Sequence, residues 1–186
     1  MSTPLIEIKE LNKYYFKNHV VKNITLDIYP GIYLLRGENG SGKTTFIKIL
    51  LGLVSKTGGE IKSNYKDYRY VPELLVIKSD VNVETYLKSV LKLRNLKRDF
   101  KLEEYLEIET NKRLNTLSKG NLKKVLLYLA FVGSPEIIFL DEPLDGLDLK
   151  MKTKVINYLN DNNLNCLISS HLEDSYSNIV GVINFD

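Results

Sequence analysis

The segment that most constrains this chain runs from Gly37 to Thr44 and reads Gly-Glu-Asn-Gly-Ser-Gly-Lys-Thr. Two glycines separated by four residues and followed by lysine and threonine form the phosphate-binding loop pattern. The glycines let the backbone curl so that its N–H groups point into one concavity, where the positive end of the following helix also attracts phosphate. Lys43 is then expected to reach the β- and γ-phosphates of a nucleotide, and the Thr44 hydroxyl to bind Mg²⁺.

The residues on both sides of this loop fit the same interpretation. Residues 31–36 form a short apolar run rich in strand formers, and residues 45–51 carry apolar side chains at helical spacing. A strand, a glycine-rich loop and a helix in this order are the structural context in which the pattern binds nucleotide. A chance match would not require that context, so we predict a nucleotide-binding protein.

Composition limits the class of protein. The chain has 186 residues, which suits one domain, and its net charge of +3 is too small to indicate a nucleic-acid partner. The single cysteine, Cys166, excludes a disulfide framework and a cysteine metal site. No apolar run approaches the length of a bilayer span, and the N-terminus lacks the features of a signal peptide. We therefore expect a cytoplasmic protein that only a partner could hold at a membrane.

Periodicity predicts mixed α/β structure, with antiparallel strands ahead of the phosphate loop. Alternating residues predict strands at 5–11 and 20–29, and residues 60–71 predict one or two more. Helical spacing predicts helices at 81–96 (capped by Asp80 or Asn82), 99–110, 122–132 and 149–160. Buried strands are predicted at 135–140, 165–169 and 180–185. Strands before the loop disfavour a simple nucleotide kinase.

A second chemical motif follows the strand predicted at 135–140. This apolar run ends in Asp141 and Glu142, followed by a proline. In phosphate-loop NTPases, an acidic residue at the end of a neighbouring strand completes the Mg²⁺ coordination, and Asp141 has that position. Glu142 lies one residue further on and is predicted to polarise an attacking water as a general base. A capping and turn role is the alternative for this pair.

A third motif, Leu-Ser-Lys-Gly-Asn at residues 117–121, lies between the phosphate loop and the acidic pair. On its own it indicates only a helix start capped by Ser118. With the other motifs in this order, residues 5–185 resemble the nucleotide-binding domain of ABC ATPases, and this motif resembles the family's Leu-Ser-Gly-Gly-Gln signature. An unrelated phosphate-loop kinase or GTPase would leave Ser118, Gly120, Glu142 and His171 unexplained.

The resemblance implies roles for individual residues. Tyr15 matches the aromatic residue that stacks on adenine, with Tyr14 as the alternative. Ser118 and Gly120 would act on ATP bound to a partner domain, and Asp148 matches the dimer-contacting loop. The catalytic residues would be Lys43, Glu142 and His171, the last matching the switch histidine. The implied ATP-binding residues are Tyr15, Gly37, Asn39, Gly40, Ser41, Gly42, Lys43, Thr44 and Thr45. The implied metal ligands are Thr44, Asp141 and Glu73.

Three features depart from the family pattern. Glu73 stands in the coupling loop where the family usually has glutamine, and it brings an extra negative charge toward phosphate oxygens. Lys119 and Asn121 replace the first glycine and the glutamine of the signature; whether Lys119 attracts phosphate or obstructs close approach is not decided by the sequence. The chain stops about fifteen residues after His171, so we expect a compact version with no C-terminal regulatory domain.

The resemblance also implies an architecture. The fold class is α/β: a phosphate-loop NTPase core of the RecA-like type with an N-terminal antiparallel β-subdomain and an inserted helical subdomain. Residues 1–186 would form a single ABC-type nucleotide-binding domain, with the helical subdomain at about residues 74–133.

The implied function is that of the ATP-binding and ATP-hydrolysing subunit of an ABC transporter, which uses ATP and Mg²⁺. Its partners would be a second nucleotide-binding domain, identical or different, and a separate integral membrane permease; the chain would lie at the inner face of the cell membrane. The loop at residues 144–148 and the compact size favour export over import. The alternative is a soluble ABC ATPase, for example one that serves iron–sulfur cluster assembly.

Overall fold

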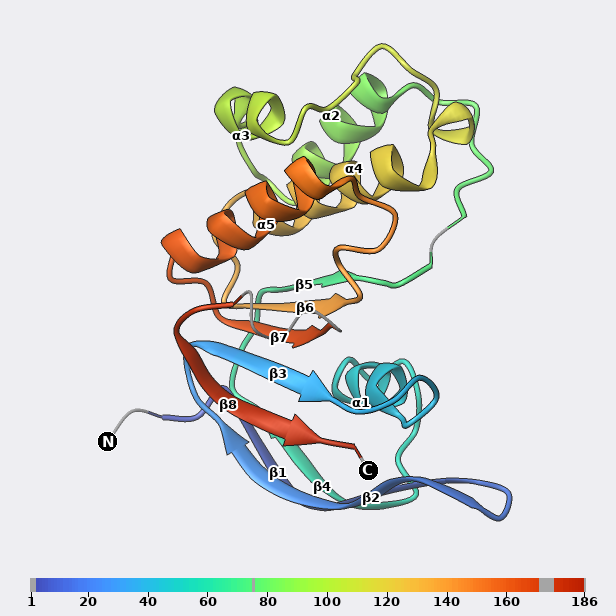
Figure 1. The fold of residues 1–186 in the computed structure, drawn as a ribbon, viewed down its shortest axis with the longest axis vertical. Coiled ribbons are helices and arrows are strands. Elements are labelled where there is room, and N and C mark those ends of the chain that lie inside the picture. Colours follow the sequence, from blue (N-terminus) through green and yellow to red (C-terminus); the bar gives the residue numbers. More distant parts are fainter. Residues whose placement is uncertain (1–2, 75, 171–175, 186) are drawn as a thin grey trace.

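The computed structural model describes residues 3–74, 76–170 and 176–185, which form two sheets and the helices around them (Figure 1). The smaller sheet has three antiparallel strands in the order β2-β1-β4. These strands are β1 (Ile6–Tyr15), β2 (Asn18–Ile28) and β4 (Gly58–Ser63). The prediction of antiparallel strands ahead of the phosphate loop is therefore confirmed.

The larger sheet has five strands in the order β5-β6-β7-β3-β8, and every neighbouring pair in it is parallel. Its strands are β3 (Ile32–Arg36), β5 (Tyr68–Val71), β6 (Ile137–Asp141), β7 (Cys166–Ser169) and β8 (Ile179–Asn184). Parallel neighbours require crossover connections, which the helices supply. Two sheets of this kind with helices confirm the predicted fold class.

Alternate residues of the central strands face two different cores. In β6, Ile137 and Phe139 belong to a buried cluster with helix α1 (Lys43–Leu50) and strand β1, so α1 lies between the two sheets. Ile138 and Leu140 belong to the other cluster, with helices on the opposite face of the sheet. Since side chains alternate along a strand, Asp141 follows Ile137 and Phe139 toward α1.

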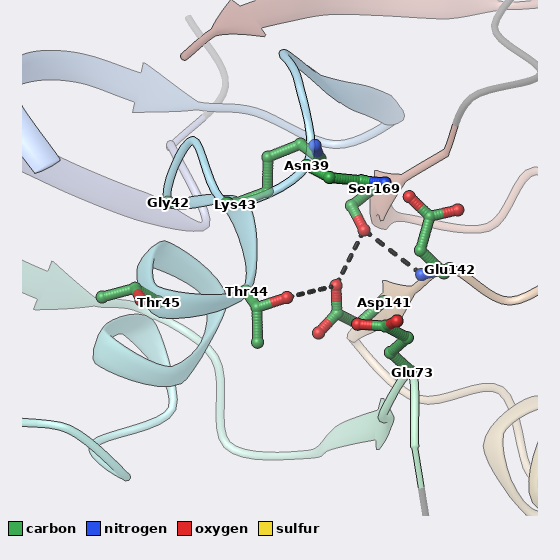
Figure 2. A pocket seen from close by; sticks show the side chains of 10 residues that line it. Asn39, Gly42, Lys43, Thr44, Thr45, Glu73, Asp141, Glu142 and Ser169 are labelled. Carbon is green, nitrogen blue, oxygen red and sulfur yellow. Dashed lines mark hydrogen bonds between the residues drawn. The ribbon is translucent and has the colours of Figure 1, made fainter. Parts of the chain in front are cut away.

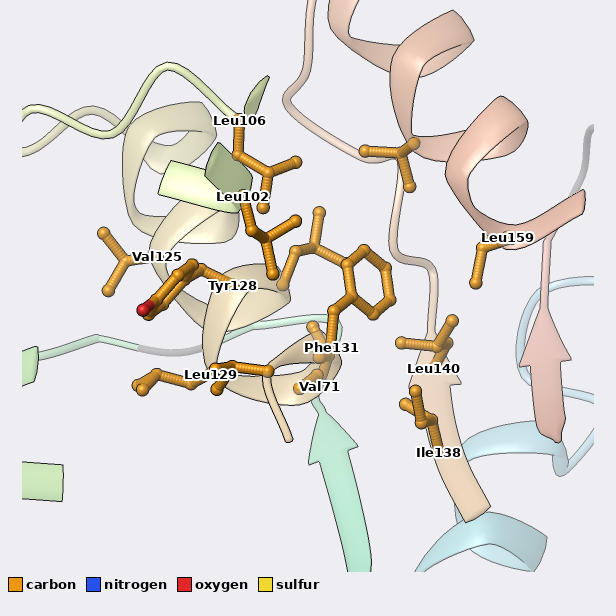
Figure 3. Packing of buried hydrophobic residues seen from close by; sticks show 14 of the residues in the cluster. Val71, Leu102, Leu106, Val125, Tyr128, Leu129, Phe131, Ile138, Leu140 and Leu159 are labelled. Carbon is orange, nitrogen blue, oxygen red and sulfur yellow. The ribbon is translucent and has the colours of Figure 1, made fainter. Parts of the chain in front are cut away.

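The second core holds the remaining helices against the larger sheet (Figure 3). Leu102, Leu106, Tyr128 and Phe131 from the helical region pack in one cluster with Val71, Ile138 and Leu140 from the sheet. The helices are α2 (Val83–Leu93), α3 (Phe100–Tyr105), α4 (Lys119–Phe131) and α5 (Leu149–Asp161), with a short 3₁₀ turn at Leu114–Thr116. Figure 1 shows these helices on one side of the sheet and α1 on the other.

Side-chain caps determine where the helices begin. Asn82, Asp99, Ser118 and Asp148 each accept a hydrogen bond from the backbone N–H three residues further on. Of the two caps considered for the helix near residue 81, Asn82 is therefore the one used. Among the described residues, no helix combines the length and the apolar character that crossing a bilayer requires.

The helix predicted at residues 99–110 is wrong in its length. Helix α3 ends at Tyr105, and Glu107 adopts a left-handed backbone conformation with φ of 54°. The Ile108 N–H then bonds to the Glu103 carbonyl, which satisfies an orphan acceptor of the helix end. The sequence remains acidic and helix-favouring after Tyr105, but the left-handed conformation of Glu107 ends the helix. In contrast, α4 begins three residues earlier than predicted because Ser118 caps it.

The carboxyl ends of the parallel strands meet at one edge of the larger sheet. Asp141 and Ser169 are paired across β6 and β7, and Leu35 is paired with Ser169 across β3 and β7. Val71, the last residue of β5, is paired with Leu140. Ligands of open α/β sheets bind outside this edge, so the fold places the phosphate loop, the acidic pair and the segment after β5 together.

A matched pair of phenylalanines tests the core between the two sheets. Phe46 of α1 is fully buried, whereas Phe16 in the β1–β2 turn is fully exposed. Phe46→Ala should lower the free energy of unfolding by about 3–5 kcal/mol, because it leaves a cavity. Phe16→Ala should change it by less than about 0.5 kcal/mol. Urea unfolding measures both values, and similar losses in the two variants would contradict the position of α1.

Candidate nucleotide-binding site

A pocket of about 420 Å³ lies at the carboxyl edge of the larger sheet, where α1 begins (Figure 2). It brings together eight residues predicted from the phosphate loop and the acidic pair, adds Glu73, which the family resemblance implied, and adds Ser169, which was not predicted. Its lining consists of Asn39, Gly40, Gly42, Lys43, Thr44, Thr45, Glu73, Asp141, Glu142 and Ser169. Figure 2 shows the carboxylates of Glu73, Asp141 and Glu142 on one side of the pocket, facing the loop and the first turn of α1. Three carboxylates and one lysine thus share the space in which phosphates and a cation would meet.

Two glycines of the phosphate loop occupy positions that a side chain could not share. Gly37 has φ of 150°, and a Cβ atom there would lie 2.5 Å from the Phe185 carbonyl oxygen. Gly42 has φ of 114°, and its Cβ atom would lie 2.5 Å from the Val20 carbonyl oxygen. The loop therefore packs backbone against backbone, which holds its N–H groups in a tight curve.

Lys43 begins α1 and is 7% exposed. Its ammonium group donates hydrogen bonds to the carbonyl oxygens of Gly37, at 2.6 Å, and of Glu38, at 2.9 Å. These bonds hold the side chain over the concave side of the loop, where a β- or γ-phosphate oxygen would meet the same positive charge.

Asp141 connects the loop helix to the sheet. Its Oδ1 atom accepts hydrogen bonds from the Thr44 hydroxyl at 3.0 Å and from the Ser169 hydroxyl at 2.8 Å. Its Oδ2 atom is buried and has no hydrogen-bond partner among the described residues. A buried carboxylate oxygen without a donor, beside a threonine hydroxyl, fits the oxygen ligand set that Mg²⁺ prefers. Among the described residues, no preformed group of three His, Cys, Asp or Glu side chains could hold a metal, so phosphate oxygens would complete the set.

Glu142 leaves the strand in an unusual backbone conformation. Its φ is 45°, a left-handed value that few residues other than glycine adopt. The Glu142 N–H donates to the Ser169 carbonyl oxygen at 3.1 Å and to the Ser169 hydroxyl at 3.2 Å. These bonds stabilise the turn that brings the Glu142 side chain into the pocket. Strained backbone of this kind is common where a functional side chain must be aimed.

The segment after β5 completes the pocket. Glu73 is exposed and lines the pocket on the side of the acidic pair. Tyr70, three residues earlier, has a buried hydroxyl, and its pKa is raised, first by burial and then by the negative charge of Asp141. Tyr70 therefore stays protonated and neutral beside the carboxylates.

Sequence reasoning missed two residues that organise the site. Ser169 ends a buried strand, and its hydroxyl joins Asp141 to the Glu142 backbone. Lys123 is a buried lysine on the apolar face of α4, and it bonds to the segments that carry Glu73 and Glu142. Two features of the sequence could have indicated them. One is a lysine within an apolar helix, and the other is a serine at the end of an apolar strand.

The two candidate adenine-stacking residues lie outside this pocket, on the β1–β2 hairpin. The Tyr14 ring stacks on His19, with ring centroids 3.9 Å apart. The Tyr15 ring is 43% exposed and lies 4.7 Å from the Lys13 ammonium group. The Tyr14 ring is 44% exposed, so both rings are accessible and each has one partner, and the choice of Tyr15 stays a prediction.

The signature and the loop at residues 144–148 pack against each other, and neither contributes to the lining of this pocket. A Cβ atom on Gly120 would lie 2.4 Å from the Gly146 carbonyl oxygen, so only glycine fits there. Lys119 forms an ion pair with Asp145, and Asp148 caps α5 through the Met151 N–H at 2.8 Å. Lys119 therefore has an acidic partner within its own chain. His171 lies outside the described residues.

A sequence model described as ABC transporter matches residues 21–145, well over half of the chain. The chain belongs to the ABC transporter family of ATP-binding proteins. An uncharacterized ABC transporter ATP-binding protein of Methanocaldococcus jannaschii is 30% identical over 90% of this chain and 68% of its own length. A zinc import ATP-binding protein of Rickettsia bellii is 33% identical over 80% of this chain and 66% of its own length. The chain thus spans about two thirds of these relatives.

Solved structures agree with the family assignment. A structure of an ABC transporter ATP-binding protein from Pyrococcus furiosus superimposes with a TM-score of 0.80 at 28% identity, covering 97% of this chain and 96% of that one. The phosphate loop, ATP binding and the mixed α/β fold of this ABC domain are therefore family properties. Domains of this family are ATPases in general, and its ATP-binding subunits work with membrane permeases.

Replacing Ser169 tests the network around Asp141. Ser169→Ala removes a buried donor to the Asp141 carboxylate, which should lower the free energy of unfolding by about 1–3 kcal/mol. Ser55→Ala, at an exposed position, should change it by less than about 0.5 kcal/mol. Equal stabilities of the two variants in urea unfolding would show that the Asp141 contact to Ser169 contributes nothing.

Proposed function

We propose that this domain binds Mg²⁺-ATP, hydrolyses it and thereby powers a membrane transporter. The observation that carries the proposal is the meeting of Lys43, Thr44, Asp141 and Glu142 in one pocket at the N-terminus of α1. Phosphoryl transfer to water requires groups that bind phosphate, a cation with its ligands, and a general base. Here these are the positive helix end with a lysine, a ligand pair for a cation, and a carboxylate in the general-base position.

Each of these residues has a separate task. The N–H groups of the loop and the Lys43 ammonium would bind the β- and γ-phosphates and offset the charge that develops on them. Thr44 and Asp141 would hold Mg²⁺, which neutralises phosphate charge when bound. Glu142 would accept a proton from the attacking water. Glu73 lines the same pocket, and we propose it as an additional oxygen ligand toward Mg²⁺.

One copy of the domain lacks part of the site. Ser118 and Lys119 are exposed at the N-terminus of α4, and neither they nor Gly120 line the pocket of their own chain. A helix N-terminus suits an anion, so we propose that it binds the γ-phosphate held by a second copy, with two ATP molecules between the copies. Asp148 would lie in the contact between copies, and His171 would contact the γ-phosphate.

The partner in the membrane would dock on the helical region. The segment between β5 and α4 exposes several large apolar side chains, which are Leu74, Val76, Leu93 and Phe100. Such residues suit burial against a permease subunit. The Rickettsia bellii relative is named for zinc import, which favours import over the export direction that the sequence favoured. We place the domain at the inner face of the cell membrane.

Removing the general base should stop the reaction after two copies have associated around ATP and before the ATP is hydrolysed. Glu142→Gln should bind Mg²⁺-ATP without hydrolysing it and elute as a dimer in gel filtration at saturating ATP. The double variant Lys43→Ala/Glu142→Gln should remain monomeric, because the lysine that binds phosphate is missing. A Glu142→Gln variant that binds ATP and stays monomeric would contradict the dimer mechanism.

A membrane pull-down separates transport from the alternative of a soluble ABC ATPase. Tagged Glu142→Gln protein with Mg²⁺-ATP, used as bait on detergent-solubilised membranes of the native cell, should retain a multi-span membrane protein. The same matrix without bait controls for adsorption. A soluble complex in its place, with the bait absent from the membrane fraction, would favour a soluble function such as iron–sulfur cluster assembly.

A further inference from the structure

Lys123 is the buried lysine of α4, with 3% of its surface exposed. Its ammonium group donates to three backbone carbonyl oxygens: Pro72 at 2.9 Å, Glu73 at 3.0 Å and Glu142 at 3.2 Å. A lysine has three donors, and here each of them has an acceptor. Burying an ammonium group is costly unless it is fully bonded, so the side chain is held firmly in one place.

The three carbonyl groups belong to two segments of the pocket. Pro72 and Glu73 follow β5, and Glu142 follows the neighbouring strand β6. Both segments carry a carboxylate that lines the pocket, Glu73 on one and Glu142 on the other. A single ammonium group therefore bonds to both loops just beyond the point where β5 and β6 are paired.

The same lysine connects these loops to the signature. Lys123 lies on α4 five residues after the Ser118 cap, about 7.5 Å along the axis at ~1.5 Å per residue. A helix is stiff over this distance, so a shift of its N-terminal turn moves the Lys123 ammonium group as well.

Lys123 also places a positive charge among acidic groups. Burial lowers its pKa, while the charges of Asp145, Asp141 and Glu73 act in the opposite direction. The ammonium group thus offsets part of the negative charge that Glu73 adds to the site. Both effects, geometric and electrostatic, act on the side of the pocket where the general base lies.

We propose that Lys123 is a positioning residue. It holds the backbone of Glu142 and the backbone of Glu73 at a fixed distance from each other and couples both to the signature end of α4. The proposal rests on the ATPase function proposed above and extends it. When a second copy contacts Ser118, the resulting shift of α4 would reach the backbone of Glu142 through Lys123. Hydrolysis would then depend on the association of two copies. Lys123 does not line the pocket, so it should affect the rate of hydrolysis far more than nucleotide binding.

Two substitutions of equal side-chain length test this role. Lys123→Met removes every donor, whereas Lys123→Gln keeps an amide that can still donate to carbonyl oxygens. Lys124→Met, at the partly exposed next position, is the matched control. For each variant, kcat and KM for Mg²⁺-ATP are measured, together with the dissociation constant of a fluorescent ATP analogue.

Lys123→Met should lower kcat by about 10- to 100-fold, less than the 10²–10⁴-fold that a positioned general base contributes, because Glu142 itself remains present. Its KM and the dissociation constant of the analogue should change by less than about 3-fold, because Lys43 and the glycine loop remain in place. Lys123→Gln should retain several times more kcat than Lys123→Met, and Lys124→Met should match the wild type. If Lys123→Met does not fold, a loss of kcat at constant affinity in Lys123→Gln supports the same role.

Three results would overturn the inference while wild-type hydrolysis remains intact: an unchanged kcat in Lys123→Met, equal losses in the Met and Gln variants, or parallel losses of kcat and nucleotide affinity. If the wild type shows no hydrolysis that the Glu142→Gln substitution removes, the proposed function itself is overturned. The Glu142→Gln variant, measured alongside, distinguishes these two failures.

Discussion

The site depends above all on the parallel pairing of β3, β6 and β7. Because Asp141 and Ser169 end neighbouring strands in register, and Ser169 is paired with Leu35 next to the end of β3, the phosphate loop, the acidic pair and the Ser169 hydroxyl start from the same edge. Side chains alternate between the two faces of a strand, and this alternation decides which face of the sheet the Asp141 side chain is on. Asp141 faces α1 because Ile137 and Phe139 do, and the Thr44 hydroxyl meets it at 3.0 Å.

Close approach of backbone to backbone is the second constraint, and it occurs at both ends of the proposed composite site. Gly42 contacts the Val20 carbonyl at the phosphate loop, and Gly120 contacts the Gly146 carbonyl at the signature. The first contact shapes the curve that receives phosphate. The second fixes the N-terminus of α4 against the loop that carries Asp148, so the signature and that loop would meet a second copy as one unit. The ion pair between Lys119 and Asp145 strengthens this unit.

Local patterns in the sequence predicted the fold class and most of the pocket, because the phosphate loop and the Asp141-Glu142 pair are contiguous motifs with fixed structural contexts. The same patterns did not reveal Ser169 or Lys123, whose contacts join residues 19 to 51 positions apart and arise only from strand order and helix packing. The overlong helix at residues 99–110 has a local cause, since its composition did not indicate the left-handed turn at Glu107. The sequence alone also could not decide what Lys119 contacts, because its partner Asp145 lies in a distant loop.

The central claim, that the signature of one copy completes the pocket of another, can be tested by cross-linking. The only native cysteine, Cys166, is buried, and burial raises the pKa of its thiol, so it should not react. Asn39→Cys and Ser118→Cys, each in the Glu142→Gln background, are mixed and treated with a short bis-maleimide. The account predicts a covalent mixed dimer only with Mg²⁺-ATP, and none when Lys97→Cys replaces Ser118→Cys. Variants that bind ATP and form no ATP-dependent mixed dimer would contradict it.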